Sequence, residues 1–277
     1  MAGLNANRGD VGSKLCRGPA HLMLKFAGKI GRRVIQGVMG ARVWIATALA
    51  LCLVGGAAAS ELFPRFARTY TVERPAHISV YNPNGDVTVS AWSRREIAVH
   101  GTPSPYSYIS DHVTGSTISI YVQRGGPSSR VGRVDFDISA PPETSISVKD
   151  TVKGRINVTG LTGHVNVNTI NGDIHLVSVR SPSIEARVTN GDIFFDGELT
   201  GSGPYNLQSM RGDIDISLPA SVPFDLSAKT LTGRINLGDF LLDMVTQQPR
   251  FITGRHDRGG PRLNLTTYDG HIILHKR

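Results

Sequence analysis

The sequence predicts an all-β fold, and three observations carry this prediction. The motif Asn-Gly-Asp-Ile occurs twice, beginning at Asn171 and at Asn190. Apolar and polar residues alternate around these and other turn glycines, and helical periodicity is nearly absent after residue 60. Because Asn-Gly between alternating residues marks a tight turn, and because it recurs, we expect a repeat of short strands joined at glycine corners.

The repeat aligns on eight turn glycines. Two positions after each stands a β-branched aliphatic residue, four positions after stands an apolar residue, and the residue between is usually polar. This alternation places one face of a strand in a core and the other in water. The units come every 19–21 residues from Gly172 to Gly233, and the corners every nine from Gly154 to Gly172. The eight glycines are Gly85, Gly154, Gly163, Gly172, Gly191, Gly212, Gly233 and Gly270.

Two architectures fit such a unit, because strands this short must stack on their neighbours to bury an apolar face. One is a β-solenoid of coils of about 20 residues, and the other is a series of hairpins that close into a β-sandwich. The solenoid is favoured, since it explains why the same residue types recur at each corner. The residues expected to carry it are structural: corner glycines Gly172, Gly191, Gly212 and Gly233, and an aliphatic ladder of Ile174, Ile193, Ile214 and Ile235.

Some stretches interrupt the repeat. Residues 101–130 are rich in Gly, Pro and Ser and read as loops around one strand, "STISIYVQ". Residues 248–262 read as a mobile excursion, and "LGDFLLDMVTQQ" (237–248) is the stretch that could hold a helical turn. Open ends of stacked strands need a cap, which residues 60–80 or the C-terminal "HIILHKR" could supply.

The charge of the chain is concentrated near its start. The formal net charge is +8, but eight of the 30 basic residues and one of the 22 acidic residues lie in 1–59, which leaves +1 for the rest. A nearly neutral body gives no broad electrostatic reason to bind nucleic acid, so no nucleic-acid partner is expected.

Both cysteines, Cys16 and Cys52, lie in residues 1–59, so neither disulfides nor thiolate metal sites are expected after this segment.

Three segments are therefore predicted. Residues 1–38 form a basic leader, with an over-extended start as the alternative, since Met39 opens a compact signal sequence. Residues 39–59 contain the apolar run "VWIATALALCLVGGAAA" and are a signal peptide, with a single membrane anchor as the alternative. Residues 60–277 form the β-solenoid domain, so the protein is expected to be exported and to lie in the periplasm, on the outer surface or at a membrane.

The chain resembles a known family over roughly 74–277. The segments that carry the resemblance are "NPNGD" followed by "VTVSAW", then 135–239 with "GRINVTGLTGHVNVNTINGDIHL", "ARVTNGDI" and "SMRGDIDISLPASVPFDLSAKTLTGRI". They resemble the bacterial putative-adhesin family, envelope proteins with a domain of unknown function. The resemblance implies a right-handed β-solenoid and an exported or membrane-associated location. It implies no set of catalytic residues.

The residue after the turn glycine is acidic in three successive units, which makes Asp173, Asp192 and Asp213 a candidate ladder. Carboxylates at strand spacing could hold Ca²⁺. The favoured reading is that they are solvated turn residues flanked by Arg155 and Arg234, with no metal and no cofactor. The tripeptide "RGD" at 211–213 matches a cell-attachment motif, but the repeat already explains Gly212 and Asp213.

Other chemistry finds little support in the sequence. His164 and His175 are eleven apart, which does not match a zinc spacing. Asp215 and Arg187 could serve a β-helix carbohydrate-active enzyme, but no nucleophile motif accompanies them. Trp92, Tyr106 and Tyr108 could form a carbohydrate platform, and anchoring of loops to the body is the favoured reading.

The sequence thus predicts a non-enzymatic, adhesin-like structural or binding module of the cell envelope. Its partner would be an envelope protein or a glycan, together with the membrane if the N-terminal segment is not cleaved. A membrane-anchored envelope sensor or scaffold is the alternative, and a carbohydrate-active enzyme is a weaker one.

Overall fold

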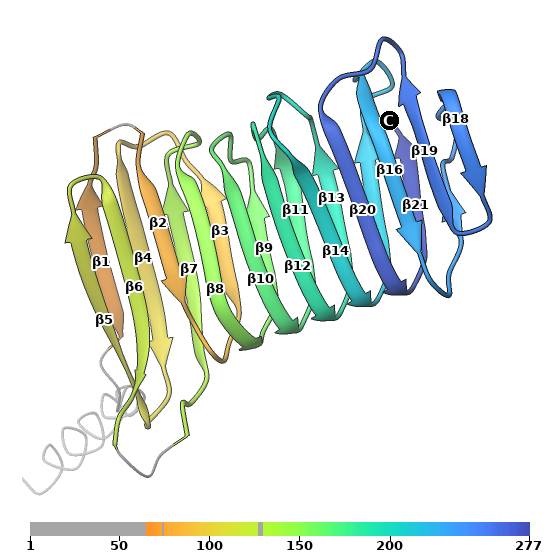
Figure 1. Ribbon diagram of the computed structural model, residues 1–277. Helices are drawn as coiled ribbons and strands as arrows, with labels where there is room; N and C mark the ends of the chain where they lie inside the picture. The colour runs from red at the N-terminus through yellow and green to blue at the C-terminus, as the bar shows by residue number, and fades with distance from the viewer. Residues whose placement is uncertain (1–64, 74, 127–129) are drawn as a thin grey trace, which may run out of the picture. The chain divides into compact units, whose positions relative to one another are not determined.

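A computed structural model of the chain describes residues 65–73, 75–126 and 130–277, and the predicted segments 1–38 and 39–59 lie outside them. The described part contains 21 strands and no helix. It consists of two sheets, a 10-stranded sheet called sheet A and an 11-stranded sheet called sheet B, whose strands are stacked along one direction (Figure 1). The prediction of an all-β fold is therefore confirmed.

The spatial order of the strands differs from their order in the sequence at both ends. Sheet A runs β1 (Phe66–Thr71), β4 (Glu96–Pro103), β7 (Val134–Ala140), β3 (Val87–Ala91), β9 (Ile156–Thr159), β11 (Ile174–Val179), β13 (Ile193–Gly197), β15 (Ile214–Leu218), β21 (Ile272–Lys276), β17 (Ile235–Asn236). Sheet B runs β18 (Asp243–Gln248), β19 (Phe251–His256), β16 (Phe224–Thr230), β20 (Arg262–Asp269), β14 (Tyr205–Arg211), β12 (Ile184–Asn190), β10 (Val165–Asn171), β8 (Ser145–Lys153), β2 (His77–Tyr81), β6 (Thr117–Arg124), β5 (Ser107–Thr114).

The centre of both sheets is parallel, which decides between the two architectures. In sheet B, β10 pairs in parallel with β8 and β12, and in sheet A, β11 pairs in parallel with β9 and β13. A hairpin can join only antiparallel strands, so a hairpin sandwich is excluded for this region. The chain instead passes from sheet A to sheet B and back in each coil, which is a β-solenoid-like arrangement.

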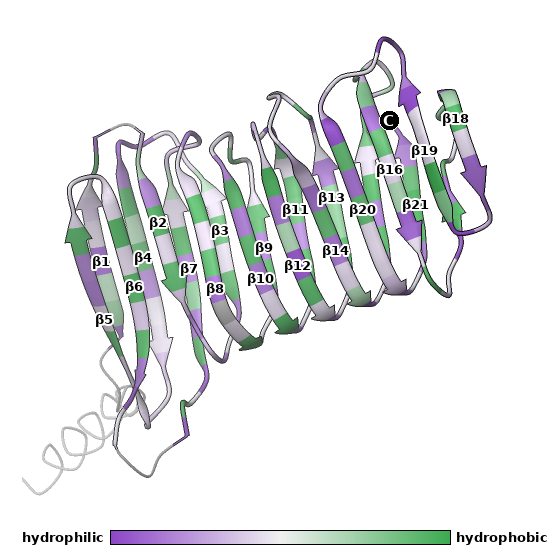
Figure 2. Cartoon of the chain, in the orientation of Figure 1, coloured by the Kyte–Doolittle hydropathy of each residue, from purple (hydrophilic) through white to green (hydrophobic). Residues whose placement is uncertain are grey.

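The core lies between the two sheets and follows from the alternation in the sequence. Hydrophobic and hydrophilic bands alternate along the strands (Figure 2). Ile174, Ile193 and Ile214 are fully buried, and each pairs with the next across β11, β13 and β15. Ile235 is only partly buried, because β17 is the edge strand of sheet A. Gly163, one of the eight aligned glycines, lies at the opposite corner, where the chain enters β10.

The coils are not all stacked in the order in which they follow one another in the sequence. The coil of β20 and β21 lies between that of β14 and β15 and that of β16 and β17. The coil of β2 and β3 lies in the same way between that of β6 and β7 and that of β8 and β9. The C-terminal strand β21 is therefore an internal strand and does not cap the stack.

The caps come from β1, which lies in the segment 60–80 predicted as a cap, and from segments for which the sequence predicted loops or a helical turn. At one end β5 pairs antiparallel with β6, and β1 pairs antiparallel with β4. At the other end β19 pairs antiparallel with β16 and with β18, so the expected excursion at 248–262 contains a strand and the expected helical turn at 237–248 contains the edge strand β18. Antiparallel strands therefore close each end without a further coil.

Candidate binding surface

Side chains at the glycine corners form a ladder that joins one coil to the next. The carboxylate Oδ1 of Asp173 accepts a hydrogen bond from the backbone N–H of Asp192 at 3.1 Å, and Oδ1 of Asp192 accepts one from the N–H of Asp213 at 2.7 Å. Oδ1 of Asp213 accepts one from the N–H of His271 at 2.6 Å. Each carboxylate therefore satisfies a backbone donor of the neighbouring coil, which an apolar side chain could not do.

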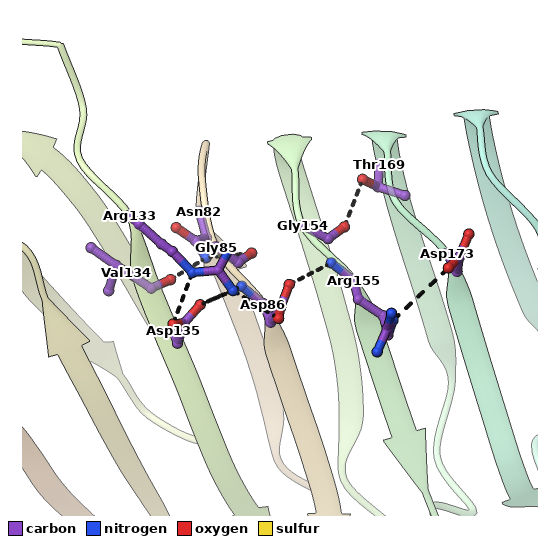
Figure 3. A network of polar contacts seen from close by, with 10 residues as sticks. All are labelled: Asn82, Gly85, Asp86, Arg133, Val134, Asp135, Gly154, Arg155, Thr169 and Asp173. Carbon is purple, nitrogen blue, oxygen red and sulfur yellow. Dashed lines mark hydrogen bonds and ion pairs between the residues drawn. The ribbon is translucent and has the colours of Figure 1, made fainter.

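The ladder begins in a small network near the N-terminal end (Figure 3). The Arg133 guanidinium contacts Asp86 at 2.8 Å and Asp135 at 3.0 Å, and its hydrogen bond to Asp135 is the main cause of a raised Arg133 pKa. Oδ1 of Asp86 accepts a hydrogen bond from the N–H of Arg155 at 2.8 Å. Arg155 in turn lies 3.9 Å from Asp173, so the charges at this corner alternate.

A second row, three residues before each glycine, explains why the sequence often has a hydroxyl there. Thr169 donates its hydroxyl to the carbonyl of Gly154 at 3.2 Å, and Ser209 donates to the carbonyl of Gly191 at 3.0 Å. Thr267 and Thr230 repeat this contact with Gly212 and Gly270, at 2.9 Å each. The Thr and Ser residues are buried, so each of these four contacts gives a buried hydroxyl its hydrogen-bond partner.

Through these contacts the aspartate ladder joins neighbouring coils. Asp173, Asp192 and Asp213 occupy equivalent positions on adjacent coils, and a backbone N–H already bonds to Oδ1 of each. Within the described residues, no group of three or more His, Cys, Asp or Glu side chains is arranged to hold a metal ion. The sequence predicted that Arg155 and Arg234 flank the aspartate ladder. Arg155 lies beside Asp173, but His271 lies between Asp213 and Arg234.

The outer face of sheet B is a second candidate, and the sequence analysis did not single it out. Two rows of polar side chains cross it at right angles to the strands, and strand pairing places the members of each row next to one another. The first row is Ser147, Asn166, Glu185, Asn206, Asn264 and Ser227. The second row is Asn168, Arg187, Gln208, Thr266 and Lys229. The sequence signal was the polar residue between the two apolar positions of each strand.

The chemistry of this polar face is that of hydrogen bonding. Asn166 donates to Glu185 at 3.0 Å, and Asn264 donates to Asn206 at 2.8 Å, so the first row is held in place by its own contacts. Asn168 and Gln208 in the second row are exposed. Amides, hydroxyls, a carboxylate and a guanidinium offer both donors and acceptors, with rungs about 4.8 Å apart.

Aromatic rings continue this face toward β6 and β5. The rings of Tyr81 and Tyr121 stack with centroids 4.6 Å apart and planes 8° apart. Each ring covers a face of the other, so the pair stabilises the pairing of β2 and β6 and leaves ring edges and hydroxyls outward. Tyr106 and Tyr108 are 64% and 49% exposed, which does not fit the favoured reading as buried anchors. Trp92 is held by a bond from its ring N–H to the Glu96 carbonyl at 2.7 Å.

The residues considered for catalysis are not brought together. Asp215 lies on β15 of sheet A, where His275 contacts it at 3.2 Å, whereas Arg187 lies on β12 of sheet B and contacts Glu185. His164, at a corner, contacts Ser183 at 2.7 Å, and His175 packs against Phe194 on sheet A. The pairs that the sequence suggested therefore lie in separate places.

The tripeptide at 211–213 is part of the corner. Arg211 contacts Oδ1 of Asn190 at 3.3 Å, and Asp213 accepts a hydrogen bond from the N–H of His271.

A hollow of about 290 Å³ lies at the end of β11, lined by Ser178, Arg180, Gly197, Glu198, Pro219 and Arg277. Its guanidiniums are paired, Arg180 with Glu198 and Arg277 with Asp196, at 3.2 Å each.

The fold and its corner ladders define a β-solenoid-like domain with polar outer faces, and the comparison with known families agrees. Residues 149–275 match the family model described as Toastrack DUF4097. The resemblance to the putative-adhesin family, a family of unknown function, is confirmed. No curated protein matches the sequence. No helix in the described residues is long and apolar enough to cross a membrane.

Two solved structures are similar to the chain. One is a putative cell adhesion protein from Clostridium sporogenes ATCC 15579, with 13% identity, a TM-score of 0.47 and coverage of 77% of this chain and 100% of the other. The second is a putative adhesin from Bacteroides fragilis NCTC 9343, with 12% identity, a TM-score of 0.35 and coverage of 77% and 97%.

Proposed function

We propose that this protein is an exported, non-enzymatic, adhesin-like module of the cell envelope that binds a linear glycan on the outer face of sheet B. The observation that carries the proposal is the pair of polar rows on that face. A glycan presents hydroxyls that both donate and accept hydrogen bonds, as these side chains do. Because the rungs repeat, a polymer can bond to several of them at once and gain affinity through many weak contacts.

The finer features of the fold belong to this proposal. A right-handed winding with a unit of about 20 residues fits the parallel crossovers and the hydrogen bonds between residues 19 or 21 positions apart. The signal peptide expected at 39–59 supports export. The separation of Asp215 from Arg187 supports a binding role over catalysis.

The test is affinity electrophoresis, in which a native gel contains a soluble polysaccharide from the envelope of the source cell. The parent chain is expected to be retarded by at least one polysaccharide. The double variant Asn168→Ala with Gln208→Ala should lose most of this retardation, because it removes two exposed amides without touching the core. The matched control is Thr88→Ala with Ser217→Ala, on the outer face of sheet A.

Three results would contradict the proposal. One is the absence of retardation by every polysaccharide tried. Another is equal retardation of the sheet B variant and the sheet A control, which would show that binding does not use this face. The third, retardation lost only in the control, would transfer the site to sheet A.

A further inference from the structure

Exposed apolar side chains form a row along one corner of the solenoid, two residues before six of the turn glycines, and the half-buried Thr189 interrupts this row once. We call this row the corner ridge. Its apolar members are 42% to 58% exposed, although they are large. Exposed apolar side chains gathered along one edge mark an interaction site more often than scattered exposed residues do. The ridge consists of Val152, Ile170, Thr189, Met210, Tyr268 and Leu231.

The strand register places these residues side by side. The pairs on either side of Ile170 join Thr169 to Thr151 and Asn171 to Lys153, so Ile170 lies opposite Val152. The same argument continues the row through β12, β14 and β20. Leu231 completes it, because Thr230 pairs with Thr267 and the N–H of Thr232 donates to the carbonyl of Tyr268 at 3.1 Å. With about 4.8 Å between strands, the ridge is about 24 Å long. In Figure 1 it follows the row of arrowheads of β8, β10, β12, β14 and β20 along the lower edge of the domain.

The rows on both sides of the ridge carry basic side chains. Lys153 and Arg211 lie in the row next to the glycines, and Arg187 and Lys229 lie in the row on sheet B. Lys153, Arg211 and Lys229 are exposed, and Arg187 is exposed but paired with Glu185. The acidic Asp269 also lies beside the ridge and accepts a hydrogen bond from Thr232 at 2.8 Å. The flanks therefore complement an anionic surface.

The geometry points to the surface of an anionic lipid bilayer as the occupant of the corner ridge. A ridge one side chain wide offers much less area than the roughly 800 Å² per partner that a stable protein interface buries. A bilayer surface does not need such an area, because apolar side chains enter the boundary between headgroups and acyl chains while Lys and Arg reach anionic headgroups. The solenoid would lie with its stacking direction along the membrane.

The experiment places a tryptophan on the ridge. The full chain with Tyr268→Trp is mixed with vesicles of phosphatidylcholine and phosphatidylglycerol that contain a brominated lipid, which quenches tryptophan fluorescence in the bilayer. The matched control is Phe194→Trp, on the outer face of sheet A. Trp44 and Trp92 are present in both variants and in the parent chain, so the quenching is compared with that of the parent.

We expect Tyr268→Trp to gain about twofold more quenching than the control, and high salt to reduce this gain. Adding Met210→Asp should remove it, because a carboxylate resists entry into the bilayer. Equal quenching of both variants would overturn the proposal. A dimer that Met210→Asp dissociates, without lipid-dependent quenching, would also overturn it and assign the ridge to a second copy of the chain.

Discussion

At the scale of single residues, the corner glycines are fixed by backbone geometry. Gly212 has a φ of +144°, and a side-chain β-carbon there would lie 2.7 Å from Oδ1 of Asp192 and closer still to the carbonyl of Gly191. Any other residue would therefore break the contact between two coils. Because the next coil meets the same limit at Gly191, the glycine recurs once per coil, and this recurrence is what the sequence displays.

We predict that Gly212→Ala lowers the free energy of unfolding by at least about 3 kcal/mol, because backbone strain and a clash add. Gly115→Ala is the control. Gly115 has a φ of +59° with open space around it, so only the backbone cost of about 1 kcal/mol should appear. Urea unfolding of both variants measures the difference. Similar losses in the two would show that contact between coils does not require the glycine.

Single residues also show which contacts could be predicted from the sequence and which could not. The alternation predicted Ile174, Ile193 and Ile214 as buried residues, and they are. The aspartates were visible as a pattern, but their bonds to backbone N–H groups depend on which coils are neighbours. The corner ridge was missed because a single apolar residue beside a turn is ordinary, and only the register turns five of them into a row.

At the scale of elements, β2 shows how an ionisable side chain responds to its place in the stack. Its first residue, His77, bonds to Ser79 at 3.0 Å and is part-buried. Burial lowers the pKa of His77, and the nearby Lys149 lowers it further. The protonated form is thus disfavoured in the folded chain relative to the unfolded chain, whose pKa is about 6.5.

The sign of the pH effect follows. His77 contributes its stability above pH 6.5, and this contribution is lost as the pH falls through the lowered pKa of the folded state. We expect the free energy of unfolding to fall from about pH 7 to pH 5, and to fall less in His77→Gln. Urea unfolding at a series of pH values in this range checks the expectation. Parallel curves for the parent and the variant would contradict it.

Elements at the ends were the least predictable. The strands β5, β18 and β19 lie in stretches that looked like loops or a helical turn, because the strands at the ends of the stack bury few residues and so lack a clear alternation. All six residues of β18 are exposed. At the same end, the buried His256 ring lies near Phe224 and Phe240, and its nitrogens contact the carbonyls of Leu241 and Ala220.

At the scale of the whole molecule, the sequence predicted the coils but not their order. Units that follow one another in the chain were expected to be neighbours in space, and this holds from β8 to β15. It fails at both ends, where one coil is inserted between two others. Insertion leaves no local signal, because an inserted coil has the same corner residues as any other, such as Thr267, Gly270 and His271.

We predict that a chain ending at residue 261 loses the cooperative unfolding transition of the parent. The truncation removes β20 and β21, which separate β14 from β16 and β15 from β17, so it opens a gap inside both sheets. A chain lacking only residues 276–277 is the control and should unfold cooperatively. Calorimetry compares the three chains. A truncated chain with a sharp transition near that of the parent would show that the remaining coils close the gap.

The inserted coil also bears on how the protein is made. During synthesis β16 to β19 emerge before β20 and β21, although the place of β20 and β21 lies deeper in the stack. The growing chain therefore cannot finish its structure coil by coil, and its final form is reached only once residues 262–276 are free to move into position. Such a chain therefore keeps unpaired strand edges until its last coil is synthesised.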